Sequence, residues 1–404
     1  MPRIDGAIVR DYLEAHSQQM VRLLEKLVRA ESPSTVAKAQ LGILRILKCE
    51  LEEVEARVEI LAGERSGGHL LALCDAHVLN GTQLLVGHCD TVWPLGTLKE
   101  MPFLRSDGRI SGPGVFDMKG GLVEIVFALR ALRDAGYAPV FRPLVFVNSD
   151  EEIGSPDSTR HIERLARSAR RALVLEAALG PAGDLKIRRK GGGRFIVTVT
   201  GKAAHAGMGP EGGASAILEL SHVIQKLHAL NNPERGVTVN VGVIEGGIRP
   251  NMIAPKSRAF VDARVERLDD APAVERAIRS IRASTRGVSL SVAGGIARGP
   301  MEATPGNLAL MATARRLGRE LSLDLSESMA GGMSDANTTS LYTPTLDGLG
   351  PIGDGAHAHH EFIYEHSLVE RAALLALLLA TPTDPPESQA VVGASRLAGA
   401  TSLG

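Results

Sequence analysis

Acids and histidines, the side chains that bind metal ions and transfer protons, follow apolar segments at five places in the chain. The first is the segment LLVGHCDT, in which His88 and Asp90 come directly after an apolar run. Residues i and i+2 of an extended segment point to the same side, so both polar groups face one place. The other four segments contribute Asp117, the run Asp150–Glu152, Glu176, and the cluster of His357, His359 and His360. Five such segments in one chain favour a shared site over isolated polar turns.

The donor types indicate a site for two divalent metal ions. Imidazole and carboxylate ligands without thiolates suit zinc, cobalt or manganese. Two histidines and three carboxylates are too many for one tetrahedral ion, but they suit two ions bridged by one carboxylate. Neighbouring residues in a turn point apart, so one acid of the run 150–152 can bind metal while the next takes a proton from water.

Strands that alternate with helices must position these residues. Helical periodicity covers residues 8–30, 40–55 and 120–136, and short strand-like runs lie between and after them. This order predicts an α/β domain with a mainly parallel sheet. Ligands of such sheets bind beyond the carboxyl ends of the strands, which is where the polar residues stand in the chain.

The pattern changes after about residue 183. The order strand, helix, strand, strand, helix, strand predicts a ferredoxin-like α+β unit. We expect this unit, residues 185–297, to be inserted into a main domain made of residues 1–184 and 298–383. The tail, residues 384–404, is rich in Pro, Ser and Gly and is predicted to be disordered.

Composition and charge argue against several classes of protein. The chain has 404 residues, with 45 basic and 46 acidic side chains and a formal net charge of −1. This balance predicts neither nucleic acid nor a membrane as a partner. Three cysteines without a close pair suit a reducing compartment. The N-terminal segment lacks the apolar core of a secretion signal, and no apolar run reaches about 18 residues, so we expect a cytoplasmic protein.

Five motifs of the sequence resemble those of a known enzyme family. The segments HCDTV, GPGVFDMKGG, DEEIGS, GKAAHAG and HAHHE are similar to the motifs of the co-catalytic zinc peptidases, and the resemblance covers about residues 10–382. That family includes acetylornithine deacetylase, aminoacylase and the bacterial glutamate carboxypeptidases that hydrolyse folates. The segment NSDEE and the loop 331–335 make the chain most similar to the glutamate carboxypeptidases. The resemblance implies a zinc-hydrolase catalytic domain with an inserted domain for dimerisation or as a lid.

The resemblance also implies two zinc ions, with Co²⁺ or Mn²⁺ as substitutes. The implied ligands are His88 and Glu176 for the first ion, Glu152 and His357 for the second, and Asp117 as the bridge. In the family, the histidine ligand usually lies four or five residues before a glutamate. His357 lies four residues before Glu361 and is therefore preferred, with His359 and His360 as alternatives.

Three further residues have implied roles in the reaction. Glu151 is the general base, and Asp90 orients His88. The second role agrees with a general rule, because a metal-bound histidine usually donates its other N–H to a carboxylate. His205 of GKAAHAG reaches across a dimer interface and hydrogen-bonds the oxyanion that forms on the scissile carbonyl. The resemblance therefore implies a catalytic homodimer.

Substrate binding is implied for two residues of the inserted domain and for one loop. Asn251 and Arg264 match residues that hold the free carboxylate of the substrate in family carboxypeptidases. Arginine suits this role because its planar fork binds a carboxylate through two bonds. The loop 331–334, with Gly332 and Ser334, could supply backbone N–H groups to the same carboxylate.

The expected function is that of a dinuclear-zinc amidohydrolase that cleaves the amide bond before a C-terminal amino acid, with glutamate favoured. The substrate is then an acyl-amino acid or a small peptide-like molecule. One alternative is an N-acyl-amino-acid deacylase of the same family, and another is a binding protein that keeps the fold without the chemistry. A two-metal phosphoesterase is a further alternative, but the sequence has no Walker-type phosphate loop.

Overall fold

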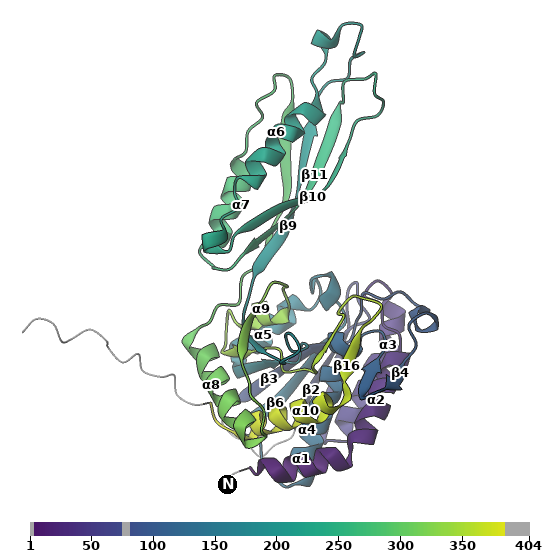
Figure 1. Cartoon of the computed structure of the whole chain (residues 1–404), viewed down its shortest axis with the longest axis vertical. Helices are drawn as coiled ribbons and strands as arrows, with labels where there is room; N and C mark the ends of the chain where they lie inside the picture. Colours follow the sequence, from purple (N-terminus) through teal and green to yellow (C-terminus); the bar gives the residue numbers. More distant parts are fainter. Residues whose placement is uncertain (1–3, 75–80, 384–404) are drawn as a thin grey trace, which may run out of the picture.

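The computed structural model describes residues 4–74 and 81–383, and the predicted disordered tail lies outside these ranges. Its main part is built on a six-stranded sheet of order β1-β2-β6-β3-β7-β14 (Figure 1). The strands are β1 (Ala56–Leu61), β2 (His69–Cys74), β3 (Thr82–His88), β6 (Arg142–Asn148), β7 (Ala169–Val174) and β14 (Thr345–Leu346). The pairs from β6 to β14 are parallel, and those of β2 with β1 and β6 are antiparallel. The prediction of an α/β domain with a mainly parallel sheet is confirmed.

Helices cover both faces of this sheet, so its central strands β6, β3 and β7 are buried along most of their length. In β3, Leu85 packs into the large core with most of the helices, whereas Leu84 and Val86 pack with Ile162 on the opposite face. The helices of the large core are α1 (Gly6–Ala15), α2 (Ser17–Arg29), α3 (Ala37–Glu52), α4 (Gly120–Asp134), α8 (Pro305–Glu320) and α10 (Glu365–Ala380). Those on the opposite face are α5 (Thr159–Ser168) and α9 (Asp335–Thr339). No helix within the described ranges is both long enough and apolar enough to cross a bilayer.

The single helix expected over residues 8–30 is two helices, so this prediction was wrong. His16 separates them with φ −105° and ψ 5°. Its Nδ1 lies 2.7 Å from the carbonyl oxygen of Tyr12, and its ring stacks on that residue's ring. The local contacts of His16 therefore interrupt a segment whose apolar spacing is helical on both sides.

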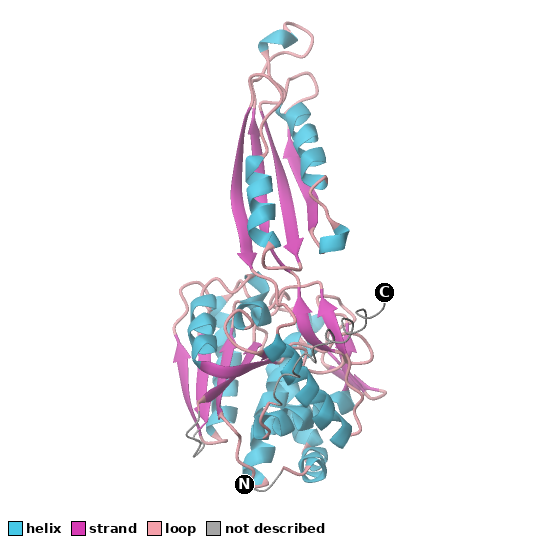
Figure 2. Ribbon diagram, turned by 90° about the vertical axis from the view of Figure 1, so that its left-hand side faces the viewer, coloured by secondary structure: helices cyan, strands magenta, loops and turns pink. Residues whose placement is uncertain are grey.

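The inserted part is a separate four-stranded sheet with its own core. Its elements are β9 (Gly191–Thr200), α6 (Ala216–His228), β10 (Thr238–Gly246), β11 (Lys256–Val265), α7 (Asp270–Ser280) and β12 (Ser289–Arg298). The strand order β10-β11-β9-β12 is antiparallel throughout, as expected for the ferredoxin-like arrangement. Both helices lie on one face (Figure 2), where alternate residues of β9, Phe195, Val197 and Val199, are buried.

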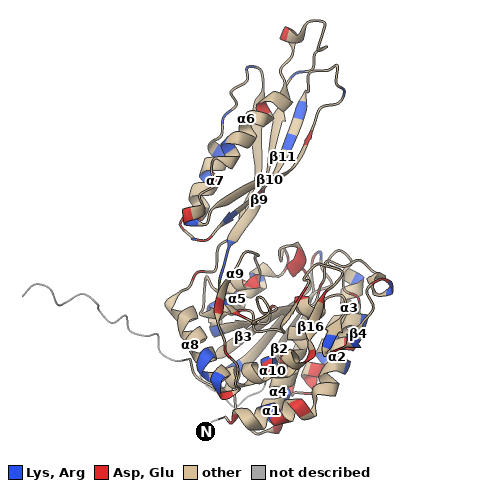
Figure 3. Ribbon diagram, in the orientation of Figure 1, with Lys and Arg blue, Asp and Glu red and all other residues tan. Residues whose placement is uncertain are grey.

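The chain enters the inserted sheet at Gly191 and leaves it after Arg298. The strand β8 (Leu185–Arg189) follows the predicted boundary at residue 185, yet it pairs with β13 (Glu327–Ala330) of the main part. The two connections touch, since a Cβ on Gly191 would lie 2.3 Å from the nitrogen of Pro300. The remaining small sheet consists of β4 (Leu104–Ser106), β5 (Arg109–Ser111), β15 (Gly353–Asp354) and β16 (Phe362–Tyr364). Acidic and basic residues are interspersed over both parts (Figure 3).

Candidate metal centre and active site

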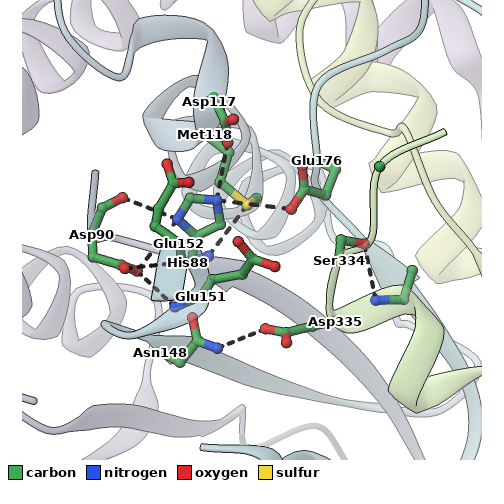
Figure 4. A network of polar contacts seen from close by, with 12 residues as sticks. His88, Asp90, Asp117, Met118, Asn148, Glu151, Glu152, Glu176, Ser334 and Asp335 are labelled. Carbon is green, nitrogen blue, oxygen red and sulfur yellow. Dashed lines mark hydrogen bonds and ion pairs between the residues drawn. The ribbon is translucent and has the colours of Figure 1, made fainter. Parts of the chain in front are cut away.

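Most of the predicted site residues of the main part meet near the carboxyl ends of the parallel strands, and Figure 4 shows six of them: His88, Asp90, Asp117, Glu151, Glu152 and Glu176. His88 ends β3, Glu176 follows β7, and the run 150–152 follows β6. This edge is where ligands of open α/β sheets bind. Asp117 arrives from the segment before α4, and His357 from the loop between β15 and β16. Strand ends therefore position part of the site, and two loops complete it.

The first group of possible metal ligands consists of His88, Asp117 and Glu176. Nε2 of His88 lies 3.0 Å from Oδ1 of Asp117 and 3.8 Å from Oε1 of Glu176. One ligand atom from each residue lies within 4.8 Å of the other two. This spacing leaves room for one cation among the three.

The second group consists of Asp117, Glu152 and His357, so Asp117 belongs to both. Nε2 of His357 lies 3.2 Å from Oδ2 of Asp117 and 2.9 Å from Oε2 of Glu152. His357 adopts a φ of 61°, a region that non-glycine residues rarely occupy and that is enriched at functional sites. The alternative ligand His359 packs beside Trp93 instead, with ring centroids 5.2 Å apart.

Asp90 connects His88 to the acidic turn. Nδ1 of His88 lies 3.0 Å from the carbonyl oxygen of Asp90 and 3.5 Å from its Oδ1. The carboxylate of Asp90 also accepts the backbone N–H groups of Glu151 and Glu152, both at 3.2 Å. Asp90 therefore fixes the ring of His88 and the start of η3 (Glu151–Ile153) together. The first acid of the turn, Asp150, accepts hydrogen bonds from Ser158.

The electrostatics of the site favour bound cations. Burial raises the pKa of Glu151 well above its ordinary value, and burial together with Asp117 raises the pKa of Glu176 to about 7. Hydrogen bonds to Asp117 and Glu152 raise the pKa of His357 to about 10. In the protein alone, His357 and part of the Glu176 population therefore carry protons that metal binding would displace. The donor set and its charge fit two divalent ions that share Asp117.

The inserted part places its predicted residues at opposite ends. The strand β9 leads away from the main part (Figure 1), so the loop that follows it lies at the far tip. His205 is in this loop, next to the loop of Asn251, whose carbonyl oxygen accepts the N–H of Ala206 at 3.0 Å. Arg264 lies at the near end, opposite Gly192.

Arg264 contacts the loop 331–334 directly. Its Nη1 donates to the carbonyl oxygen of Gly331 at 2.7 Å, and its Nε donates to Asp262 at 2.8 Å. The carbonyl oxygen of Gly332 accepts a hydrogen bond from Arg189 at 3.0 Å. Ser334 caps α9, a short helix that the sequence did not reveal (Figure 4). The N–H of Ser334 donates to the side chain of Asn337 in the same cap.

Glu361 fixes the backbone of the segment that carries Asp117. In the sequence, Glu361 served only to select His357 among the three histidines. Glu361 is 1% exposed and accepts the backbone N–H groups of Gly114, Phe116 and Asp117 at 2.9 to 3.1 Å. It also accepts the indole N–H of Trp93 at 3.1 Å. Burial raises the pKa of Glu361 to about 7, although these N–H groups act in the opposite direction.

We expect Glu361→Ala to lower both metal content and stability. The variant would leave several buried N–H groups without an acceptor, at a cost of about 1–3 kcal/mol each if they stay unpaired, and would release the segment of Asp117. Metal analysis and urea unfolding measure the two effects. Glu64→Ala is the matched control, because it removes an exposed pair with Arg160 that contributes about 0–1 kcal/mol. Unchanged metal content and stability in Glu361→Ala would contradict this role.

Comparisons with known proteins identify the family of the chain. The model of the family described as peptidase family M20/M25/M40 matches residues 84–381. Carboxypeptidase G2 of Pseudomonas sp. (strain RS-16) is 26% identical over 370 residues, which cover 89% of this chain and 88% of that relative. Acetylornithine deacetylase of Myxococcus xanthus is 32% identical over 238 residues, 51% of this chain and 60% of the relative.

A solved structure shares the fold of this chain. Aminopeptidase PepT from Bacillus cereus ATCC 10987 aligns with a TM-score of 0.75 and 22% identity, over 90% of this chain and 98% of that chain. The family match spans most of the chain and includes both groups of possible metal ligands. These findings confirm the resemblance inferred from the five motifs. The chain belongs to peptidase family M20/M25/M40 and is a hydrolase of peptide or amide bonds.

Proposed function

We propose that this protein is a dinuclear-zinc carboxypeptidase that cleaves the amide bond before a C-terminal amino acid, with glutamate preferred. The observation that carries the proposal is the pair of ligand groups that share Asp117, with Glu151 beside them. His88 and Glu176 would hold one zinc ion, Glu152 and His357 would hold the other, and Asp117 would bridge them. Cobalt or manganese could replace zinc at such a donor set.

In the proposed hydrolysis, Glu151 transfers the proton and Asp90 holds the groups around it. When bound, the two ions would polarise the scissile carbonyl and favour deprotonation of the attacking water. Glu151 takes the proton of this water and delivers it to the leaving nitrogen. Asp90 holds His88 and the backbone of Glu151, so the ligand and the base keep a fixed relation.

His205 acts on the site of a partner subunit in this proposal. The ten residues of β9 span about 33 Å, which separates the tip from the main part of the same chain. The edge strand β10 carries exposed Val243 and Ile244, at 56% and 62%, and Ile217 of α6 is also exposed. Exposed apolar side chains on a sheet edge favour pairing with a second copy. A homodimer would bring the tip, with His205 and Asn251, to the partner's metal centre.

The substrate carboxylate would be bound from two sides. Arg264 lies at the near end of the inserted part, beside the loop 331–334 of its own chain. Asn251 shares the tip with His205 and would approach from the partner. A free carboxylate next to the scissile amide is the group that such an arrangement recognises.

Two relatives support different substrates within this class. The relative named carboxypeptidase G2 supports release of a C-terminal amino acid and matches this chain over most of both lengths. The relative named acetylornithine deacetylase supports N-acyl-amino-acid deacylation as the second candidate, and it matches over a shorter segment. In both cases the products are a free amino acid and a carboxylic acid.

Product analysis tests the proposal. The zinc-loaded protein is incubated with folyl-glutamate, N-acyl amino acids of several side chains, peptides and a phosphate ester. We expect free glutamate from the glutamate-terminated substrates at the highest kcat/KM. Preferential release from acetylornithine-type substrates would favour the second candidate. Phosphate release without any amino acid would contradict both.

Subunit mixing tests the role of His205. Homodimers of Glu151→Gln and of His205→Ala are each expected to be nearly inactive. If His205 acts on the partner's site, each mixed dimer has one site with both defects and one with neither. Activity should therefore reappear after subunit exchange. Mixed dimers that form, as shown by mass spectrometry of tagged chains, and stay inactive would contradict the proposal.

A further inference from the structure

The carboxylate of Glu151 is held by an arginine that the motifs did not reveal. Arg298 is the last residue of β12, at the point where the chain returns from the inserted part, and it pairs with Gly192 of β9. Its Nη1 donates to Oε1 of Glu151 at 3.1 Å. The side chain of Arg298 is only 9% exposed, so this contact lies inside the protein.

A buried network fixes the other side of the guanidinium. Nη2 of Arg298 donates to Oδ1 of Asp335 at 3.0 Å and to the hydroxyl of Ser155 at 2.5 Å. Asp335 also accepts a hydrogen bond from Asn148, the last residue of β6, at 2.6 Å (Figure 4). The planar fork of Arg298 therefore ties Glu151 to the end of a central strand.

Stability alone does not account for this arrangement. Nε of Arg298 is buried without a hydrogen-bond partner within the described residues, which is unfavourable. The guanidinium pairs with two acids, Glu151 and Asp335, but its burial costs desolvation of a charge. Well-packed apolar side chains in place of such a buried ionic group are often as stable or more stable. The backbone of Glu151 is already held by Asp90, so Arg298 adds control of the side chain.

We propose that Arg298 is a positioning residue for the general base: it holds the carboxylate of Glu151 where it takes the proton from water. The inference rests on the proposed function, because it requires Glu151 to act as a base. A glutamate side chain has several rotatable bonds, and a misplacement of about 1 Å can lower a rate by about 10²-fold. Arg298 removes this freedom through its contact with Oε1 of Glu151.

Kinetics of Arg298→Met and Arg298→Lys test the inference on the best substrate of the wild-type protein. Arg298→Met should lower kcat by about 10–10²-fold, with KM and metal content nearly unchanged. Arg298→Lys should recover part of kcat, because lysine keeps the charge but lacks the fork that reaches both acids. Arg194→Met is the matched control, an exposed arginine on the adjacent strand β9, and should behave as wild type.

A double variant separates positioning from other roles. If Arg298 acts only through Glu151, Arg298→Met should cause no further loss of kcat in a Glu151→Gln background. A full additional loss, or a rise in KM alone, would overturn the inference. If Arg298→Met does not fold, Arg298→Lys with and without Glu151→Gln gives the same test. If the wild-type protein shows no hydrolytic activity, both the proposed function and this inference are overturned. If the wild-type protein is active and the Arg298→Met variant keeps its kcat, only this inference is overturned.

Discussion

Replacement of Glu151 by Gln is expected to lower kcat by about 10²–10⁴-fold, the usual scale for loss of a general base. Gln keeps the size of the side chain and can still contact Arg298, but its amide cannot take the proton. Metal content should stay near that of the wild type, because Glu151 belongs to neither ligand group. Steady-state kinetics and metal analysis of the same preparation measure both quantities.

Glu152→Gln is the matched control for this prediction. Glu152 is the next residue in the same turn, but its Oε2 lies 2.9 Å from His357 in the second ligand group. The control should therefore lose metal, and its activity should recover in part when excess zinc is added. If Glu151→Gln loses metal while Glu152→Gln keeps it, the two roles are assigned in the wrong order.

Asp117→Ala is expected to remove metal from both positions and to reduce activity to the background. Asp117 contacts His88 through Oδ1 and His357 through Oδ2, so each ligand group loses a member. By contrast, Glu176→Ala should affect mainly the first position. Metal analysis, with calorimetric zinc titration of the metal-free protein, separates the two cases. Asp324→Ala, at an exposed position between α8 and β13, is the control for metal lost during purification.

An Asp117→Ala variant that retains one tightly bound zinc ion per chain would contradict the bridging role. The same variant with full activity would contradict the proposed site as a whole. Circular dichroism of the metal-free proteins excludes misfolding as the cause of either loss, because a folded variant keeps the helical signal of the wild type.

Much of the fold could be predicted because its signals are local. Apolar runs such as 84–86 are buried on both sides, and the alternation in β9 matches a sheet covered on one face. The break at His16 and the short helix α9 were missed because single side chains determine them, through contacts that apolar spacing does not encode. The position of β8 depends on pairing with β13, more than 130 residues later, which no local pattern reveals.

The site residues, too, were predictable where the signal is local and were missed where it depends on contacts between distant parts of the chain. His88 and Asp90 were predictable because they end a strand, and strand ends meet at one edge of a parallel sheet. Arg298 and Glu361 were not assigned roles, because they meet Glu151 and Asp117 from 147 and 244 residues away in the chain. A histidine motif identified His205, but only the direction of β9 shows that it lies at the far tip.

Zinc reconstitution of the chelated protein tests the central claim most directly. Zinc is added in known ratios to the metal-free wild type, and release of glutamate from a glutamate-terminated substrate is measured with bound metal at each ratio. The account predicts no activity without metal and full activity as bound zinc approaches two ions per chain. Full activity in protein that holds no metal, or saturation at one ion with no second binding event, would contradict it.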